Sequence, residues 1–148
     1  MKKILILCAV LSISAIFSCR YEVKTAPDAV MKCFESRFPD ATRIEWERDM
    51  GQFKASFSIN DQEKEAWFEK EGDWVRTKTD ISLSEVPEAV LETARNYKDG
   101  EWKIENIDYF EQASGVSRYY RIEYDRENSE KERIVRIIPE GSIITDYR

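Results

Sequence analysis

The chain has 148 residues, of which 42% are hydrophobic and 12% aromatic, enough to bury the core of one domain or of two small joined ones. It contains no histidine, which excludes a Ser-His-Asp triad, a Cys-His pair and a His-ligated metal. The net charge of −6 becomes more negative if Lys2 and Lys3 leave with a leader, which argues against nucleic acid and anionic membranes as electrostatic partners.

The first residues have the form of a secretory leader. A positive start is followed by an apolar run over 4–17 that is too short to span a bilayer comfortably. The run ends in Ile16-Phe-Ser-Cys19, which resembles a bacterial lipobox with Cys19 as the lipidated residue. We therefore expect a signal peptide over 1–18 and a tether over 19–26. The expected location is periplasmic or attached to the outer membrane by the N-terminal lipid, and the protein is secreted if Cys19 is not acylated.

Cys33 is the single cysteine left once Cys8 and Cys19 are assigned to the leader and the lipid. A lone cysteine cannot form an internal disulfide, even in an oxidising compartment. Because Cys33 stands among Val30 and Phe34 on an expected helix, we interpret it as a small core residue rather than a reactive thiol.

A helix followed by four strands is expected in the first half. The helix covers 27–37, with Pro27 at its first position and Val30, Phe34 and Phe38 on one face. In the first strand Ile44 and Trp46 are expected to face inward. Strict alternation of apolar and polar residues predicts antiparallel strands that are covered on one side only. The four strands are expected at 42–47, 53–59, 64–69 and 74–79.

The second half has the same order of elements. Its helix is expected over 84–97, with Ser84 as the N-cap and Val86, Val90 and Ala94 on the apolar face. Trp102 is expected to face inward. The four strands that follow are expected at 102–110, 117–125, 132–138 and 142–147.

Three pairs of segments indicate that the halves are copies of one unit. Residues 27–30 match 87–90, residues 53–57 match 120–124, and residues 70–74 match 139–143. The predicted fold is α+β: two tandem helix-plus-four-strand repeats, at 27–82 and 83–148. Because each half alone has a marginal core, the repeats should form one curved antiparallel sheet with both helices on one face.

A set of motifs resembles the PepSY-like family, the beta-lactamase-inhibitor-like envelope proteins of Bacteroidetes. They are Phe38-Pro39-x-Ala41, Trp46, Trp67-Phe68-x-x-x-Gly72-x-Trp74 and Pro87-x-x-Val90. The resemblance runs from about Ala26 to Ile144 and implies two such repeats with the helices on the convex side of the sheet. It also implies a secreted or lipid-anchored protein. Inhibition of a beta-lactamase does not follow, because the inhibitor that names the family uses disulfides in its repeats.

The polar face of the expected sheet carries a set of aromatic and basic residues. Alternation puts five of them on the uncovered side: Trp67, Trp74, Arg76, Tyr119 and Arg121. Trp, Tyr and Arg are enriched at binding hot spots, so we interpret this set as a binding surface. Two alternatives stay open: Trp67 and Trp74 pack across their hairpin as a cross-strand pair, or a register shifted by one residue buries them.

Acidic residues gather around the same hairpin, at Glu63, Glu65, Glu69, Glu71 and Asp73. Carboxylates of this kind bind Ca²⁺, but no loop has EF-hand spacing, which favours a solvated face. Pairs of carboxylates also serve glycosidases, yet such pairs are common at this composition. We therefore expect no catalytic residue, no cofactor and no metal.

Together these patterns predict a non-enzymatic cell-envelope binding module that grips a protein or peptide on the open sheet face, with inhibition as one form of that role. This interpretation predicts that Trp67 and Trp74 are accessible to solvent and that the protein has no deep polar pocket. The alternative is a carrier or sensor of a small ligand or metal in a groove between sheet and helices, which requires an apolar cavity or converging carboxylates. The sequence identifies neither the partner nor the oligomeric state.

Overall fold

The computed structural model describes residues 21–97, 101–127 and 133–147. The fold is α+β, with one antiparallel sheet and, among the described residues, two α-helices and one short 3₁₀ helix. The elements are, in chain order, β1 (Tyr21–Val23), α1 (Asp28–Arg37), β2 (Thr42–Asp49), β3 (Gln52–Ile59), β4 (Gln62–Phe68), β5 (Trp74–Asp80), η1 (Leu83–Glu85), α2 (Glu88–Tyr97), β6 (Lys103–Gln112), β7 (Arg118–Asp125), β8 (Arg133–Ile137) and β9 (Ile143–Tyr147).

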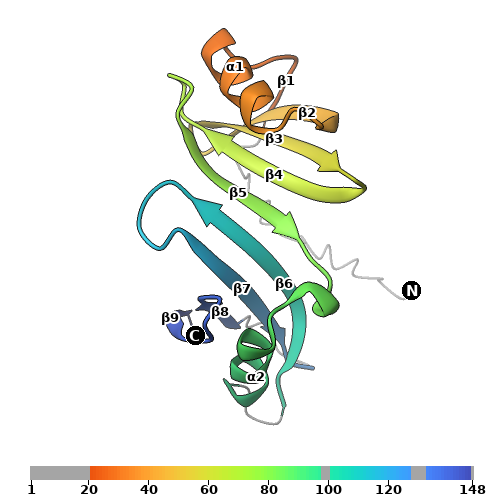
Figure 1. Ribbon diagram of the computed structural model, residues 1–148, viewed down its shortest axis with the longest axis vertical. Coiled ribbons are helices and arrows are strands. Elements are labelled where there is room, and N and C mark those ends of the chain that lie inside the picture. The colour runs from red at the N-terminus through yellow and green to blue at the C-terminus, as the bar shows by residue number, and fades with distance from the viewer. Residues whose placement is uncertain (1–20, 98–100, 128–132, 148) are drawn as a thin grey trace, which may run out of the picture.

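The strands lie in the sheet in the same order as in the chain, and each pairs with the next. The sheet is therefore a meander with β1 and β9 at its edges. Figure 1 shows α1 at one end of the molecule and α2 at the other, with the strands between them. The β5–β6 pair joins the two halves in the middle of the sheet.

Both helices cover the same face of the sheet. On β3, α1 packs against Ala55 and Phe57, and on β7, α2 packs against Ile122 and Tyr124. The register links these sets across the sheet. Phe57 pairs with Lys64, Lys64 with Thr79, Thr79 with Tyr109 and Tyr109 with Tyr120, so these residues lie on one side of the pleat. The predicted α+β class with an open antiparallel sheet is confirmed, and in this structure the two helices pack on one side of that sheet. We call the opposite side the open face.

Each helix has its own apolar cluster. In the first half, Phe34 of α1 makes edge-to-face contacts with Trp46 and Phe57 at centroid distances of 5.2 and 5.0 Å. In the second half, the buried Tyr124 hydroxyl donates a hydrogen bond to the Ala94 carbonyl oxygen at 2.8 Å and secures α2 against β7. Cys33 packs at the edge of the first cluster, as a core residue would.

The start of the second helix differs from the prediction. The predicted helix from Ser84 is interrupted: a 3₁₀ turn spans Leu83–Glu85, and α2 begins only at Glu88. The backbone at Val86 is extended, as expected for a residue that precedes a proline. The capping residue is Ser82 instead, which forms a capping box with Glu85.

Two further differences concern the first strands. Tyr21–Val23, which we expected in the tether, pairs with β2 as an edge strand. Ile44, which we expected in the core, is 43% exposed because the register shifts between Thr42 and Glu45. Trp46 lies beyond this bulge and is buried as predicted. In the described part of the chain, no helix has the length and apolar character needed to cross a membrane.

Candidate binding face

A hollow of about 550 Å³ opens on the open face where the two halves meet. It is lined by Glu65, Trp67, Arg76, Lys78, Phe110, Gln112, Tyr119, Arg121 and Arg136. These residues come from five consecutive strands, β4 to β8, so the site exists only in the joined sheet.

The strand register places these side chains in rows across the sheet. One row runs from Trp67 to Arg76 to Gln112, and the next runs from Glu65 to Lys78 and on to Phe110 and Tyr119. A third row runs from Asp108 to Arg121 to Arg136. Because directly paired residues share a face of the sheet, all of them face away from the helices.

The floor of the hollow is aromatic. Phe110 and Tyr119 stack face to face, with ring centroids 5.1 Å apart and planes 5° from parallel. The indole of Trp67 is fixed by a hydrogen bond that its Nε1 donates to Asp49 Oδ2 at 2.7 Å. All three rings are buried, and Trp67 and Tyr119 are each only 5% exposed.

Basic side chains lie over these aromatic rings. The guanidinium carbon of Arg76 lies 4.2 Å from the centroid of the Trp67 ring, and that of Arg136 lies 5.2 Å from Tyr119. Arg121 approaches the Phe110 ring at 5.9 Å. Cations over aromatic faces are attracted by the ring quadrupole. The surface that a partner would meet therefore consists mainly of guanidinium groups, with the aromatic rings beneath them.

Most of the basic side chains at or beneath the hollow form ion pairs with carboxylates. Lys54, which is 2% exposed, donates to Glu65 Oε1 at 2.6 Å and also pairs with Glu47. Burial raises the pKa of Glu65, but the hydrogen bond and charge of Lys54, with the charge of Lys78, outweigh it and keep that pKa below its usual value. Glu65 is thus ionised at neutral pH.

Asp108 lies beneath the second part of the hollow and is fully buried. Lys78 Nζ is 3.8 Å from one of its carboxylate oxygens and Arg121 Nε is 3.6 Å from the other. Burial raises the pKa of Asp108, and the two cations reduce that rise without cancelling it. For Lys78, burial lowers the pKa, but Asp108, Asp80 and Glu65 more than compensate and hold it above its usual value.

Four of the five residues that we predicted for a binding surface lie together in this hollow. They are Trp67, Arg76, Tyr119 and Arg121. The accessibility that we expected of Trp67 is wrong, because Arg76 and Lys54 cover its ring. The basic residues of the set are thus more accessible than its aromatic ones.

Trp74 does not join this set, and that prediction is wrong. A bulge between Trp67 and Phe68 pairs Phe68 with Trp74, which places Trp74 on the helix face. There its Nε1 donates to Thr77 Oγ1 at 2.9 Å, and its ring packs against the first apolar cluster. The two tryptophans lie on opposite faces, so they do not form a cross-strand pair either.

Phe110 and Arg136 belong to the hollow but were not predicted. Alternation counted from Trp102 and Ile104 puts Phe110 in the core, yet a bulge between Ile104 and Asn106 reverses the parity of the rest of β6. Arg136 stands between the buried Val135 and Ile137, and that alternation is the signal that would have found it.

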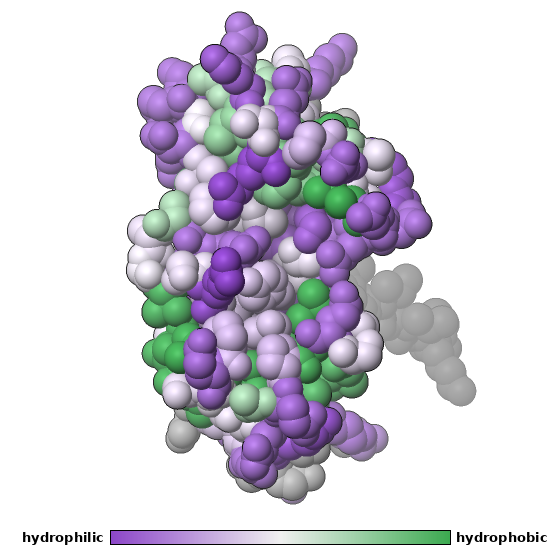
Figure 2. Space-filling model, viewed as in Figure 1, coloured by the Kyte–Doolittle hydropathy of each residue, from purple (hydrophilic) through white to green (hydrophobic). Residues whose placement is uncertain are grey.

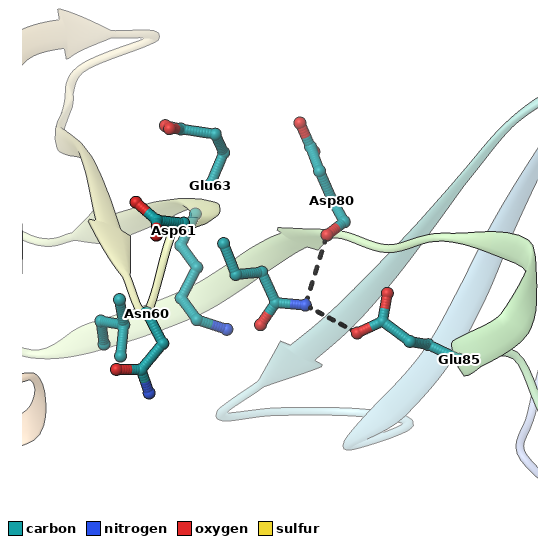
Figure 3. A pocket seen from close by; sticks show the side chains of 8 residues that line it. Asn60, Asp61, Glu63, Asp80 and Glu85 are labelled. Carbon is teal, nitrogen blue, oxygen red and sulfur yellow. Dashed lines mark hydrogen bonds between the residues drawn. The ribbon is translucent and has the colours of Figure 1, made fainter.

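A second hollow, of about 720 Å³, lies at the β3–β4 turn beside η1 and has an acidic rim (Figure 3). Gln62 Nε2 donates to Glu85 Oε1 at 3.2 Å, a hydrogen bond drawn as a dashed line in Figure 3. Across the described ranges, no three Asp, Glu or Cys side chains are grouped so that they could hold a metal ion. A separate, smaller hollow next to η1, lined by residues that include Leu83 and Ile107, measures about 120 Å³, well below the volume of a typical small-molecule site.

Figure 2 shows the side of the molecule seen in Figure 1, where apolar surface forms separate patches among hydrophilic side chains. Large exposed apolar side chains include Met50 and Leu83, which come from different parts of the chain. Such scattered residues are usual on soluble proteins and do not mark a docking site.

A family model described as "Putative beta-lactamase-inhibitor-like, PepSY-like" matches residues 51–131, more than half of the chain. No curated protein matches the sequence. Among solved structures, a DUF2874 family protein of Bacteroides ovatus is similar, with a TM-score of 0.77, 25% identity, and coverage of 84% of this chain and 89% of that one.

Two more solved structures share the fold. A BLIP-like protein of Bacteroides fragilis has a TM-score of 0.75 at 21% identity and covers 84% of this chain and 87% of its own. A "putative periplasmic" protein of Bacteroides eggerthii has a TM-score of 0.74 at 23% identity, with 83% and 88% covered. At these identities the likeness establishes the fold.

Proposed function

Because the chain belongs to the PepSY-like, beta-lactamase-inhibitor-like family, we propose that it is a non-enzymatic binding module of the cell envelope that grips a protein or peptide on its open face. Inhibition of the bound partner is one form that this role takes. The name of the BLIP-like relative agrees with that form.

One observation carries the proposal: the hollow over Trp67, Phe110 and Tyr119, with arginines lying on the rings. Hot spots of protein interfaces are enriched in Trp, Tyr and Arg and sit in well-packed pockets. Here the rings are held in place before any partner arrives, since Asp49 fixes Trp67 and Phe110 stacks on Tyr119. A preorganised site loses little conformational entropy on binding.

Site-directed photocrosslinking in native cells tests this function. A photoreactive amino acid in place of Gln112, which lines the hollow, should capture a protein or peptide in the envelope. The same amino acid in place of Glu92, an exposed residue of α2, serves as the control and should capture no such species.

The adduct formed at position 112 should be lost when Trp67→Ala is added, in a chain whose unfolding curve shows that it is still folded. Equal adducts at positions 112 and 92, or none at either, would contradict the function. Adducts that survive Trp67→Ala would move the binding surface elsewhere.

We also propose that the protein is anchored in the envelope by lipid on Cys19, which lies outside the described residues. The support is the lipobox-like segment and the periplasmic description of the Bacteroides eggerthii relative. Metabolic labelling with a radioactive fatty acid should mark the wild-type chain and not Cys19→Ser, and that variant should leave the membrane fraction. Labelling of both chains, or of neither, would rule the anchor out.

We infer, finally, that residues 27–82 and 83–148 are two copies of one helix-plus-four-strand unit. Support comes from two matching contacts. A Cβ on Gly72 would lie 2.7 Å from the carbonyl oxygen of Ala29, and a Cβ on Gly141 would lie 2.8 Å from that of Ala89. Both alanines stand at the same place in the Pro-Asp-Ala-Val and Pro-Glu-Ala-Val segments that open the two helices.

A further inference from the structure

We propose that the hollow takes an acidic segment of its partner, with an Asp or Glu carboxylate binding at Arg76 and its neighbouring arginines. This inference rests on the proposed function and names the chemistry of the partner. The acidic character of the whole chain does not suggest it, because the net charge of −6 argues for repulsion of anions.

The charge of the hollow is opposite to that of the protein. Its lining contains the four cations Arg76, Lys78, Arg121 and Arg136, and a single carboxylate, Glu65. Asp108 beneath them, with Asp80 and Glu123 beside them, pairs with Lys78 and Arg121, so the positive charge that the protein's own carboxylates do not pair lies around Arg76. Complementary potentials raise association rates and exclude partners of the wrong charge, so this patch favours an anionic segment.

Arg76 is the cation that such a segment would find available. Lys78 contacts Glu65 and Asp80, and Arg121 contacts Glu123 and Asp108. Within the described part of the chain, by contrast, no carboxylate lies within 4 Å of the Arg76 guanidinium, whose partner is the ring of Trp67. Stacking leaves the edge N–H donors of a guanidinium directed outward, in the fork geometry that binds a carboxylate with two hydrogen bonds.

The surroundings of Arg76 also favour an anion. Burial lowers the pKa of Arg76, and Arg136 acts in the same direction, while Asp49, Tyr119 and Glu65 oppose the change. The protein thus holds a half-buried positive charge that its own groups only partly compensate. A carboxylate brought close to it would replace lost hydration with charge-assisted hydrogen bonds.

The mixture of signs selects a peptide carboxylate over a phosphate group. Glu65 lies in the wall of the hollow and Asp108 beneath it, so a doubly charged phosphate meets repulsion that a single carboxylate largely avoids. A nucleic acid would in addition meet the acidic surface around the hollow. The rings of Trp67 and Tyr119 lie beneath the guanidinium groups of Arg76 and Arg136 and hold them in place, so a peptide would meet a cationic surface that is already ordered.

Selection from a random-peptide display library on the immobilised full chain tests the inference. Peptides that bind the wild type should be enriched in Asp or Glu, and exchange of that residue for Asn or Gln should weaken binding roughly tenfold to a hundredfold. Binding should also weaken as salt concentration rises. Arg76→Gln should remove the preference for acidic peptides, and Arg76→Glu should shift it toward basic ones.

Arg95→Gln is the matched control, because Arg95 is an exposed arginine of α2 that pairs only with Glu88 among the described residues. It should leave the selected peptides unchanged. Arg76 is a cleaner target than Arg121, whose loss would also deprive the buried Asp108 of a counter-ion. Unfolding curves of both variants establish that they are folded.

The possible results distinguish a failure of this inference from a failure of the proposed binding function. Peptides that bind through Trp67 without any acidic preference would overturn the inference and leave the binding function standing. Inorganic phosphate that displaces the acidic peptides as strongly as free glutamate-containing peptides do would assign the site to free anions and also overturn it. Failure to select any peptide, together with no crosslink at position 112, would overturn both.

Discussion

The guanidinium of Arg37, at the end of α1, lies over the ring of Trp74, at the start of β5, with 3.5 Å between the guanidinium carbon and the ring centroid. The Nε1 of Trp74 also donates to Thr77 on the same strand. The residue therefore ties the first helix to the strand beside it, on the face that the helices cover.

Trp74→Ala should destabilise the fold and leave the binding specificity intact. Removal of a packed tryptophan costs about 3–5 kcal/mol at a fully buried site, and because Trp74 is half-buried we expect the lower end of that range. Denaturant unfolding measures the loss, and peptide selection under folding conditions measures the specificity. A variant of wild-type stability that had lost acidic peptides would place Trp74 in the binding site after all.

Gly72 and Gly141 should tolerate no side chain. Both have positive φ, at 99° and 91°, and both face the main chain of a helical alanine at less than 3 Å from an added Cβ. The left-handed conformation alone costs roughly 1–2 kcal/mol for a residue with a Cβ. The clash with Ala29 or Ala89 should add about 1–3 kcal/mol, the usual penalty of overpacking.

Gly51→Ala is the control, since Gly51 has φ of 90° and nothing within 4 Å of an added Cβ. Gly51→Ala should lose only the stability that the left-handed conformation costs, without the cost of a clash. Urea unfolding of the three variants compares the two costs. Equal losses at all three positions would mean that the contacts with the helices carry no energy, and would weaken the case that the halves are copies.

Strand alternation shows how much of this fold can be predicted from the sequence. Alternating apolar residues identify antiparallel strands and the face that the helices cover, because the period of two follows directly from the pleat. They do not reveal where one extra residue enters a strand. Among the described strands the register shifts at four places, and each shift breaks the alternation of faces along a strand. Three of these shifts explain why Ile44 and Trp74 were misplaced and why Phe110 was missed.

The hollow itself was predictable only in part. Tyr119 and Arg121 lie on β7, which pairs without a register shift with β6 from Arg118 to Glu123 and with β8 from Tyr120 to Tyr124. Counting along that strand therefore places them correctly. The cover of cations over the rings depends on side-chain conformations across several strands, which no local pattern encodes. Short β1 was missed because three residues cannot display a period, and its pairing rests on backbone hydrogen bonds.

Glu65→Gln should make the protein less stable at neutral pH and less sensitive to acid. The folded state lowers the pKa of Glu65, so its stabilising contribution is present above its unfolded pKa and is lost as pH falls through the folded value. Loss of its charge-assisted bond with the buried Lys54 should cost about 1.5–3 kcal/mol at pH 7. Glu47 remains as a partner of Lys54, which keeps the loss from being larger.

Unfolding by urea at neutral pH and at about pH 3, well below the unfolded pKa near 4.3, tests this expectation. The gap between Glu65→Gln and wild type should shrink at the acidic pH. Glu92→Gln, which removes one exposed carboxylate from α2, is the matched control. A gap that stays constant with pH would mean that the carboxylate charge is not what stabilises this position.

Asp108→Asn should have the opposite pH dependence. The folded state raises the pKa of Asp108, so the contribution of this group is largest below its unfolded pKa and is lost as pH rises through the folded value. In the wild type, ionisation of Asp108 therefore costs stability at neutral pH, and the amide avoids that cost.

Lys78 keeps Glu65 and Asp80 as partners, and Arg121 keeps Glu123, so neither cation is left alone. The variant should consequently be within about 1 kcal/mol of wild type at pH 7, on either side, because a buried ion pair contributes little beyond its own desolvation. As pH falls from 7 to about 4, the wild type should gain stability relative to Asp108→Asn. A loss of several kcal/mol at pH 7 would show instead that attraction to Lys78 and Arg121 exceeds the cost of burying the carboxylate.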